Sequence, residues 1–482
     1  MKNHRFGTAL ALIALLGGCG GGGGSTGGAP NPPPIAGTPP PPPPATTAGC
    51  GLRERQDWAA SVLDEWYLFP ETLPTARNPG SFSSVEAYID QLTATARAQG
   101  KDRYFTYLTS IKEENAYYSS GSSAGLGVRL SYDTPGRRVF VEEAFEGAPA
   151  LNAGIDRGTE ILAIGTAGNL RTVTDIIAAE GAAGITKALG PGEAGVTRVL
   201  RISNSAGTRD VTVTKAEYEL LPVSTRYGAK VLTDGGKKVG YVNLRTFIST
   251  ADPALRDAFA KFKAEGVTEV IVDLRYNGGG LVRIAELMSD LLGGNRSPSD
   301  VQSYTAFRAS KSQNDETRFF QPQPQSISAM KIAFIGTGSS ASASELVMNA
   351  FIPYLGANAA LVGTNTYGKP VGQIAIDRTA CDDRLRVIAF ATQNKNRQGD
   401  YYQGLASKFQ ATCQATDDIS KPLGDPQEAS IARALDFLAG RACTPISSSG
   451  GLTTQGFREV ESRELITPER PSTAQREVPG LF

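Results

Sequence analysis

Val270-Ile271-Val272-Asp273-Leu274, followed at once by Arg275-Tyr276-Asn277-Gly278-Gly279-Gly280, is the stretch of sequence that decides the fold class. A short, β-branched apolar run that ends in a polar, glycine-rich turn predicts a strand buried on both faces. Other strands are expected at residues 239–244, 331–335 and 359–362, and helices at residues 253–264, 281–292 and 345–355. Such alternation is typical of a parallel sheet covered by helices, so residues 224–443 are expected to form an α/β domain.

Ser342-Ala343-Ser344-Glu345 stands where a helix is expected to begin, just after the strand at residues 331–335. A helix start carries free N–H groups and the positive end of the helix dipole, so the N–H of Ala343 can face a developing oxyanion. Lys369 follows another predicted strand, and a lysine in an apolar cleft has a lowered pKa and can act as a neutral base. These residues suit a Ser342 nucleophile with a Lys369 base. On residue types alone, however, an N-cap serine and an exposed loop lysine are the simpler interpretation.

The sequence contains one histidine, His4, in a segment typical of a cleaved export signal. A mature protein without histidine has no Ser-His-Asp triad, no Cys-His pair and no His-ligated metal site. The cysteines show no C-x-x-C spacing, which argues against zinc. We therefore expect no metal and no cofactor, and in any hydrolytic reaction a side chain other than histidine must move the proton.

Residues 1–19 have the pattern of a lipoprotein signal peptide. Basic residues near the start precede an apolar run at residues 9–16, which is too short to span a bilayer. Leu16-Gly17-Gly18-Cys19 resembles a bacterial lipobox, which implies lipidation of Cys19; a plain signal peptide with an incidental cysteine is the alternative. Residues 20–49 are rich in glycine and proline and are expected to form a tether. We expect an exported protein, anchored by lipid to a bacterial membrane and facing the periplasm or the cell exterior.

Charge and cysteine content fit an exported globular protein. The sequence has 48 basic and 48 acidic residues, so nothing indicates a nucleic-acid surface. Four cysteines remain after Cys19, and an oxidising compartment permits them to form disulfides. Of the three possible pairings we expect Cys381 with Cys413, which closes a local loop, and Cys50 with Cys443, which ties together the ends of the folded region. Free buried thiols are the alternative.

Two smaller domains are expected before the α/β domain. Residues 50–120 have aromatic and aliphatic side chains at near-helical spacing, which predicts a helical N-terminal domain. Residues 121–223 change to short strands, and there Gly125-Leu126-Gly127 resembles the carboxylate-binding loop of PDZ domains. A further stretch, Gly158-Thr159-Glu160-Ile161-Leu162, resembles a PDZ motif but lacks its usual aspartate. A PDZ-like domain binds peptide ends by strand addition; the alternative is that Gly125 and Gly127 only form a turn.

Three other motif matches fail on their context. Gly121-Ser122-Ser123-Ala124-Gly125 fits G-x-S-x-G, but a strand before it, a helix after it and a histidine are all missing. Ser328-Ala329-Met330-Lys331 fits S-x-x-K, but Lys331 opens a predicted strand and not a helical turn. Residues 363–369 fit most of a Walker A loop, yet Pro370 stands where Ser or Thr would hold Mg²⁺, and a strand follows. An NTPase is therefore only a third alternative.

Several motifs, in order, resemble the C-terminal processing proteases, which are tail-specific S41 serine peptidases. The motifs are Asp102-Arg103-Tyr104-Phe105-Thr106-Tyr107-Leu108, the stretch at residues 273–280, Ser342-Ala343-Ser344-Glu345, Tyr367-Gly368-Lys369, and Gln373. The resemblance covers about residues 52–441. It implies a multidomain protein with a helical N-terminal region, a PDZ-like β-rich domain and an α/β catalytic core of the ClpP/crotonase type.

The resemblance also implies roles for individual residues. Ser342 is implied to be the nucleophile, Lys369 the general base and Gln373 the residue that orients the lysine. Gly279, or alternatively Gly280, is implied to form the oxyanion hole together with the N–H of Ala343.

Two departures from the family pattern concern loop geometry. Pro370 replaces the usual glycine after the lysine, and Lys369 comes 27 residues after Ser342, a longer separation than we expect for the family. Neither change removes a reacting group.

The sequence therefore predicts a serine endopeptidase that hydrolyses exported proteins and recognises their free C-terminal ends. Its expected partners are protein or peptide substrates and, through the N-terminal lipid, a membrane; no nucleic acid is expected. A non-catalytic, peptide-binding lipoprotein with an inactive protease core is the alternative function. Residues 444–482 are polar with scattered prolines and are expected to be disordered.

Overall fold

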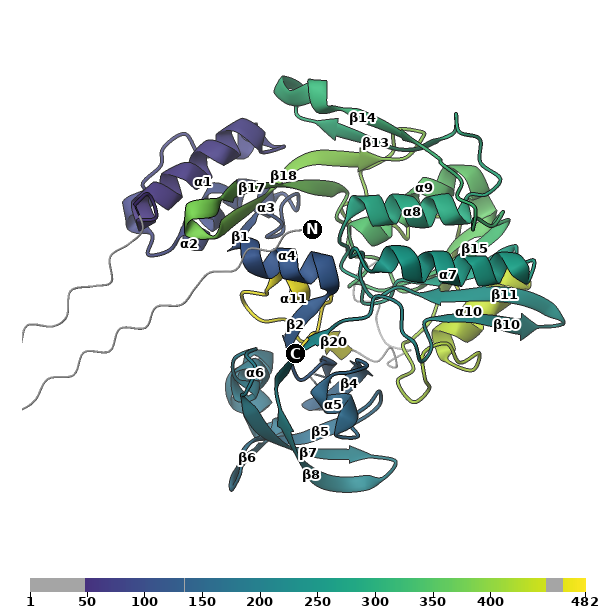
Figure 1. Ribbon diagram of the computed structural model, residues 1–482, viewed down its shortest axis with the longest axis horizontal. Helices are drawn as coiled ribbons and strands as arrows, with labels where there is room; N and C mark the ends of the chain where they lie inside the picture. The colour runs from purple at the N-terminus through teal and green to yellow at the C-terminus, as the bar shows by residue number, and fades with distance from the viewer. Residues whose placement is uncertain (1–47, 134, 448–462) are drawn as a thin grey trace, which may run out of the picture. The chain divides into compact units, whose positions relative to one another are not determined.

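The computed structural model describes residues 48–133, 135–447 and 463–482, drawn in colour in Figure 1. These residues belong to one compact unit that begins at Thr47. His4, Cys19, the expected signal peptide and nearly all of the expected tether lie outside the described residues. Within the described ranges, no helix has the length and apolar character needed to cross a membrane.

A six-stranded sheet forms the centre of the α/β domain. Its strands, in spatial order, are β10 (Ala229–Asp234), β11 (Lys237–Asn243), β12 (Glu269–Asp273), β15 (Lys331–Gly336), β16 (Ala359–Gly363) and β19 (Ala411–Gln414). β10 is antiparallel to β11, and every other neighbouring pair is parallel. The apolar stretch at residues 270–274 begins within β12, whose side chains at residues 270–272 are buried on both faces of the sheet, as predicted.

Helices cover both faces of this sheet. They are α7 (Ala251–Ala264), α8 (Val282–Leu292), α9 (Ala343–Leu355) and α10 (Ala429–Leu438). Successive side chains of a strand point to opposite faces: Val270 and Val272 pack with α7, α8 and α9, whereas Ile271 packs with α10. Figure 1 shows α7 and α8 side by side, in contact with each other. The α/β prediction for this part of the chain is confirmed.

A second, five-stranded sheet joins the first helices of the chain to the α/β domain. Its strands are β1 (Tyr107–Ser110), β13 (Val301–Phe307), β14 (Glu316–Phe319), β17 (Val371–Arg378) and β18 (Asp383–Gln393). Helices α1 (Leu52–Trp66), α2 (Val85–Leu92) and α3 (Ala94–Ala98) share one apolar core with β17 and β18. Residues 50–120, predicted to be a helical N-terminal domain, contain α1 to α3 and α4 (Ile111–Ser120), but they pack closely with the later chain: β1 pairs with β18, and the helices bury their apolar faces against β17 and β18.

Residues 121–223 are rich in strands. After α4 (Ile111–Ser120), β2 (Ser122–Gly125) pairs with β9 (Ala216–Glu219) as a two-stranded ribbon. The other strands, which join a seven-stranded sheet, are β3 (Val128–Asp133), β4 (Arg138–Ala144), β5 (Glu160–Thr166), β6 (Asn169–Thr172), β7 (Thr197–Asn204) and β8 (Gly207–Thr214). The short helix α5 (Pro149–Asn152) and the longer α6 (Val173–Leu189) pack on the apolar side of this sheet.

Residues 463–482 contain a strand and a helix, which corrects the prediction of a disordered tail at residues 444–482 for this part; residues 448–462 lie outside the described residues. β20 (Arg463–Leu465) pairs antiparallel with β3 as the seventh strand of the sheet, and α11 (Thr473–Glu477) lies beside α4 (Figure 1). The few apolar residues of this segment are buried, with Ile466 and Val478 each 0% exposed. Burial and strand pairing thus hold a stretch whose average composition alone does not predict a fold.

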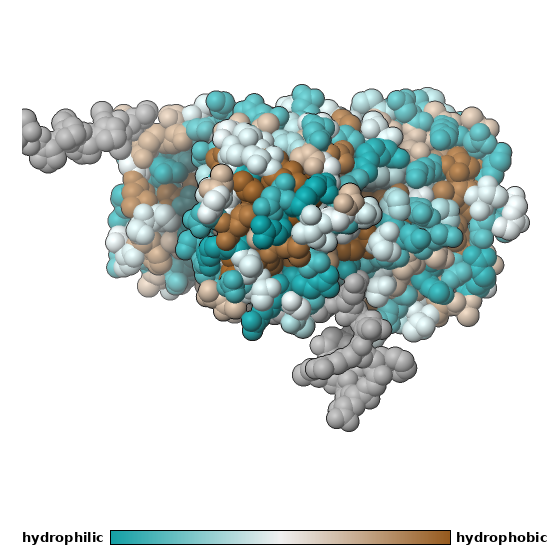
Figure 2. Space-filling view, turned by 90° about the horizontal axis from the view of Figure 1, so that it is seen from below, coloured by the Kyte–Doolittle hydropathy of each residue, from teal (hydrophilic) through white to brown (hydrophobic). Residues whose placement is uncertain are grey.

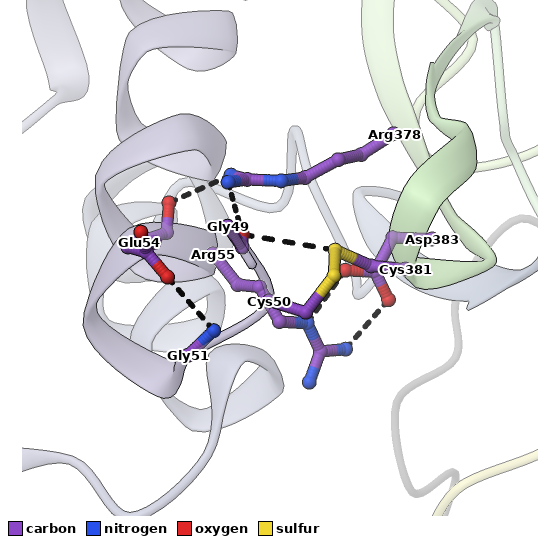
Figure 3. The surroundings of a disulfide bond; sticks show 8 residues. All are labelled: Gly49, Cys50, Gly51, Glu54, Arg55, Arg378, Cys381 and Asp383. Carbon is purple, nitrogen blue, oxygen red and sulfur yellow. Dashed lines mark hydrogen bonds and ion pairs between the residues drawn. A yellow bond between two sulfur atoms is a disulfide. The ribbon is translucent and has the colours of Figure 1, made fainter. Parts of the chain in front are cut away.

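Two disulfides are present, and their pairing differs from the expected one. Cys50 is bonded to Cys381, and Cys413 to Cys443. Figure 3 shows the first bond beside the start of α1, where Arg55 forms an ion pair with Asp383. The expected pairing was wrong because β18 brings residue 381 to α1, whereas Cys413 lies at β19, close to the chain that follows α10.

Apolar residues are also found at the surface. On the face drawn in Figure 2, hydrophobic residues gather in patches between hydrophilic ones, the largest near the middle of the view. Among the described residues, the large hydrophobic side chains left exposed are Leu52, Tyr104, Phe319 and Met330. Of these, Tyr104 lines the cleft of the candidate active site.

Candidate active site

Ser342 lies in a sharp turn between β15 and α9. It is the residue just before the helix, and its φ of +55° is unusual for a residue with a side chain. Such a conformation costs on the order of 1–3 kcal/mol and persists only where the surroundings enforce it. A strand, a strained turn and a helix are also the setting that exposes a nucleophilic serine in hydrolases with a nucleophile elbow.

The serine turn is tied to the glycine-rich loop after β12. Ser340 Oγ donates to the carbonyl of Leu274 at 2.8 Å, and the N–H of Ala341 donates to the carbonyl of Asn277 at 3.0 Å. Ser344 Oγ also donates to the carbonyl of Asn277, at 2.9 Å. These bonds hold the turn against the carboxyl end of the neighbouring strand, which is where ligands bind in parallel α/β sheets.

Glu345 joins the serine turn to the loop that carries Lys369. Its side chain is fully buried, and one carboxylate oxygen, Oε2, accepts from the backbone N–H of Ser342 at 3.1 Å and of Lys369 at 2.7 Å. The other oxygen, Oε1, accepts from the N–H of Gly368 at 2.7 Å and from Thr366 Oγ1 at 2.6 Å. Burial raises the pKa of Glu345, and these hydrogen bonds partly oppose that shift. One carboxylate thus fixes the backbones of both candidate catalytic residues.

Lys369 is half-buried, and its amine is held in place by Gln373. Lys369 Nζ donates to Gln373 Oε1 at 2.9 Å and lies 5.0 Å from the centroid of the Phe105 ring. Gln373 Nε2 in turn donates to the carbonyl of Phe105. A register shift of β17 against β18 occurs between Gly372 and Gln373, and such a bulge changes the direction of the side chains that follow it.

The charge state of Lys369 is set mainly by its removal from water. Desolvation lowers its pKa below the ordinary value, while the nearby carboxylate of Glu477 partly opposes this by favouring the charged amine. Among the described residues, no hydrogen bond joins Lys369 Nζ to Ser342 Oγ. Lys369 therefore has a lowered pKa, and a hydrogen bond to Gln373 fixes the position of its amine.

The predicted oxyanion donors are only partly free. Gly279 has a φ of +127°, and a Cβ built on it would lie 2.9 Å from Ser342 Cβ, so only glycine fits this close to the serine. Its N–H, however, donates to Asn277 Oδ1 at 2.9 Å, whereas the N–H of Gly278 donates to the carbonyl of Glu477 at 2.9 Å. Ala343 begins α9, where backbone N–H groups have no partner within the helix.

The part of the chain that contains these residues matches a known protein family. Residues 238–399, which contain Gly279, Ser342, Lys369 and Gln373, match the model of peptidase family S41. Residues 238–399 form a peptidase family S41 domain. The resemblance inferred from the motifs is thus confirmed for this part of the chain.

Relatives of the S41 domain extend the likeness. The chain is 29% identical over 360 residues to the chloroplastic carboxyl-terminal-processing peptidase 3 of Arabidopsis thaliana, covering 72% of this chain and 65% of that protein. It is 31% identical over 184 residues to the chloroplastic C-terminal processing peptidase of Tetradesmus obliquus, covering 36% of this chain and 38% of that protein. The chain thus spans less than two thirds of the length of either relative.

The fold itself has a known counterpart. A crystal structure from Bacteroides fragilis, described as a candidate S41 protease, superposes with a TM-score of 0.62 at 23% identity, over 80% of this chain and 97% of that one. This comparison supports an S41 protease-like fold that combines α/β and sheet-rich parts.

Next to the S41 site is a cleft of about 1330 Å³. Gly278, Ala341 and Lys369 line it from the S41 domain, and Ala124 and Phe482 line it further along. Gly125 ends β2, Leu126 and Gly127 connect it to β3, and the N–H of Gly127 donates to the carbonyl of Phe482 at 2.8 Å. The predicted peptide-binding loop therefore lies beside the same cleft as Lys369.

The rejected motifs lack the geometry that their chemistry needs. Ser122 and Ser123 lie within β2, which follows a helix, the reverse of a nucleophile elbow. Lys331 Nζ donates to the carbonyls of Phe437 and Leu438, so it is bound to the end of α10 and does not face Ser328. Lys369 is followed by β17, so the helix start that a Walker A loop requires is missing there.

The sequence did not predict that Glu345 binds the backbone of both Ser342 and Lys369, although Glu345 belongs to the motif Ser342-Ala343-Ser344-Glu345. A signal existed, because an acidic residue three positions after a helix-capping serine commonly accepts a hydrogen bond from the backbone of that serine. The roles of Asn277 and of the carbonyl of Phe105 had no such local signal. Within residues 48–133, 135–447 and 463–482, no cluster of three or more histidine, cysteine or acidic side chains is placed to hold a metal ion.

Proposed function

We propose that this chain is a serine endopeptidase in which Ser342 is the nucleophile and Lys369 the general base. The observation that carries the proposal is the buried carboxylate of Glu345, which accepts from the backbone N–H of Ser342 at 3.1 Å and from that of Lys369 at 2.7 Å. A shared anchor of this kind is expected where two loops must be held in register for a reaction. The S41 match over residues 238–399 and the C-terminal processing relatives support the same reaction class.

In the proposed mechanism, neutral Lys369 accepts the proton of Ser342 Oγ as that oxygen attacks the carbonyl carbon of the substrate. The new C–O bond gives a tetrahedral oxyanion, which the N–H of Ala343 stabilises together with an N–H of the glycine-rich loop. The C–N bond then breaks, and Lys369 returns the proton to the leaving amine. Water, deprotonated by the same lysine, hydrolyses the acyl-enzyme and restores both side chains.

The glycine-rich loop donor needs a change of partner before it can act. Gly279 is the donor expected from the family, yet its N–H is bound to Asn277 Oδ1. Gly278 directs its N–H toward a backbone carbonyl, that of Glu477 at 2.9 Å, which is the group that a substrate presents. We therefore propose Ala343 with either Gly278 or Gly279 as the oxyanion donors.

The sheet-rich domain at residues 121–223 is proposed to be PDZ-like and to bind the ends of substrates. The N–H groups of Gly127 and Val128 both donate to one carbonyl oxygen, that of Phe482, at 2.8 and 3.1 Å. Paired N–H donors at the start of β3 suit a peptide that adds as a further strand beside it. Amidation of a peptide substrate should weaken its binding relative to the free acid, and equal binding would remove the carboxylate from the recognition scheme.

Export and lipid anchoring through Cys19 complete the proposal, so that the substrates are exported proteins. The bonds Cys50–Cys381 and Cys413–Cys443 support an oxidising compartment, because disulfides seldom persist in a reducing cytosol. Mass spectrometry of protein isolated from membranes should detect a lipid on Cys19, and an unmodified Cys19 would contradict the anchor.

Hydrolysis of an unfolded protein tests the function. Purified protein should cleave reduced, carboxymethylated casein, and Ser342→Ala should abolish cleavage while leaving the thermal unfolding temperature unchanged within a few degrees. Ser328→Ala is the matched control, since Ser328 is exposed and belongs to the rejected S-x-x-K motif; it should retain full activity. Casein cleavage that survives Ser342→Ala would refute the assignment, and an inactive but peptide-binding protein would favour the non-catalytic alternative.

A further inference from the structure

Residues 480–482 lie along β3, in the peptide groove proposed for the sheet-rich domain, and α11 directly precedes them. Gly480 and Phe482 exchange backbone hydrogen bonds with β3: the N–H of Leu130 donates to the Gly480 carbonyl at 2.8 Å, and the N–H of Phe482 donates to the Val128 carbonyl at 2.9 Å. Arg129 and Leu481 form an antiparallel bridge between these bonds. The segment therefore lies on β3 in the way that a bound peptide adds a strand to a sheet edge.

Apolar side chains hold the segment in this groove. Val478 and Leu481 pack among aromatic residues at the junction of the domains, and Phe482 packs into the core of the sheet-rich domain with 8% of its surface exposed. A Cβ built on Gly125 would lie 2.8 Å from the carbonyl carbon of Phe482. The groove thus accepts bulky apolar side chains, and the backbone of the bound segment lies so close to Gly125 that a side chain there would clash with it.

The same segment continues into the catalytic cleft. The N–H of Gly278 donates to the carbonyl of Glu477, and Glu477 Oε2 would lie 3.2 Å from a Cβ built on Gly279. Tyr118 donates to Glu477 Oε1 at 2.9 Å. A Cβ on Gly278 would come within 2.2 Å of the carbonyl oxygen of Arg476, so this backbone fills the space beside the glycine-rich loop.

The groups around Glu477 do not form a fully satisfied core. Burial raises the pKa of the Glu477 carboxyl group. The nearby Lys369 partly opposes this shift because its charge favours the ionised carboxylate. Arg476 stacks on Tyr107, with its Cζ atom 3.8 Å from the centroid of the ring. Its Nε is nevertheless buried and has no hydrogen-bond partner among the described residues. Buried polar groups that lack partners cost free energy, which is expected of a contact that is made and released.

We propose that residues 472–482 are an internal ligand that blocks the peptidase until a substrate end displaces it. This inference rests on the proposed function, because it uses the same groove and the same catalytic residues. It also defines the substrate class: peptides that can add to β3 as a strand and place large apolar side chains at the positions of Leu481 and Phe482. Substrates with acidic or small end residues compete poorly for this groove.

A reversible crosslink tests whether the segment must leave. Thr109 Oγ1 on β1 and Thr473 Oγ1 on α11 are 3.2 Å apart, so cysteines at both positions can form a disulfide. In the full chain, the oxidised Thr109→Cys/Thr473→Cys variant should cleave casein about tenfold or more slowly than after reduction with dithiothreitol. Equal casein cleavage by the oxidised and reduced forms, with the crosslink verified by mass spectrometry, would overturn the proposal. The Thr109→Cys single variant, treated identically, controls for reduction of the native disulfides.

A binding measurement separates this proposal from the proposed function. In the Ser342→Ala background, a fluorescein-labelled peptide with the sequence of residues 472–482 should bind the reduced double variant and should not bind the oxidised one. This readout needs no catalysis, so it decides the inference even if casein is not hydrolysed. Equal peptide binding by both forms would overturn the internal-ligand role.

A point substitution gives a second route that leaves the segment in the chain. Phe482→Asp places a carboxylate in the apolar groove and should raise the affinity for the labelled peptide about tenfold or more, because the groove is then vacant for a larger fraction of the time. Thr467→Asp adds the same charge at an exposed position just before residues 472–482 and should leave the affinity unchanged. Unchanged peptide affinity in the Phe482→Asp variant would count against the proposal.

Discussion

Replacement of Glu345 by glutamine removes one acceptor oxygen from the group that joins the loops of Ser342 and Lys369. The carboxylate accepts four hydrogen bonds, two at each oxygen. If the amide oxygen takes the place of Oε2, the bonds from Ser342 and Lys369 remain. The amide NH₂ then faces the hydroxyl of Thr366, which can turn to accept, and the N–H of Gly368, which cannot.

The better orientation of the glutamine therefore leaves the buried backbone N–H of Gly368 without an acceptor, facing an amide hydrogen. This costs about 1–3 kcal/mol of folding free energy. In the opposite orientation the backbone N–H groups of Ser342 and Lys369 both lose their acceptor, which costs more. A displacement of about 1 Å in either catalytic loop lowers the rate on the order of 10²-fold. We expect Glu345→Gln to lower kcat on casein by about that factor and to lower the unfolding temperature by only a few degrees.

The matched control is Glu114→Gln. Glu114 is also fully buried and is paired with Arg384 and Arg386, and within the described part of the chain it accepts no hydrogen bond from the loops of Ser342 and Lys369. It should lose a similar amount of thermal stability while retaining kcat within a few-fold. If Glu345→Gln behaves like Glu114→Gln in both calorimetry and steady-state kinetics, Glu345 supports folding alone and the reasoning from the shared anchor fails.

Four further predictions concern the lysine and the disulfides. Because Lys369 must be neutral to accept a proton and its pKa is lowered by burial, kcat/KM should rise with pH through a value below the ordinary lysine pKa of about 10.4, and Lys369→Arg should be inactive; an active arginine variant would contradict its role as base. Glu477→Gln should move that rise to lower pH, because the Glu477 carboxylate favours the charged lysine; a shift to higher pH would have the wrong sign. Gln373→Ala should reduce kcat with little change in KM or in the unfolding temperature, and unchanged kinetics would remove it from the site. Cys50→Ser, which breaks the bond to Cys381 and opens a connection of 331 residues, should lower stability by about 2–5 kcal/mol in denaturant titrations; an unchanged midpoint would argue against this pairing.

Local sequence was sufficient where short-range physics decides the structure. The buried run that became β12 and the small, polar loop that leads into α9 were predicted because hydrophobic period, turn chemistry and helix starts are properties of neighbouring residues. Helix α6 was missed because its alanines, glycines and threonines give a weak amphipathic pattern, and packing on the sheet-rich domain stabilises it.

Predictions that depended on distant contacts succeeded less often. No local pattern predicted that α1 and α2 complete an apolar core with β17 and β18. The sequence showed where glycine is needed but not which group each glycine N–H binds. Gly279 was expected to direct a free N–H at the oxyanion, yet its N–H donates to Asn277 Oδ1, two residues earlier. Such pairings depend on how each loop closes and not on composition.

The sequence by itself determined the α/β class, the position of Ser342 at the start of a helix and the set of motifs shared with peptidase family S41. Only the tertiary structure decided that Glu345 anchors the loops of Ser342 and Lys369, that Cys50 is bonded to Cys381, and that residues 480–482 lie along β3 while Glu477 lies near Lys369. The physical reason is that helix starts and buried strands depend on interactions between near neighbours. Disulfide partners, shared carboxylates and an occupied groove depend on burial between segments hundreds of residues apart, whose free energy appears only once the chain has folded.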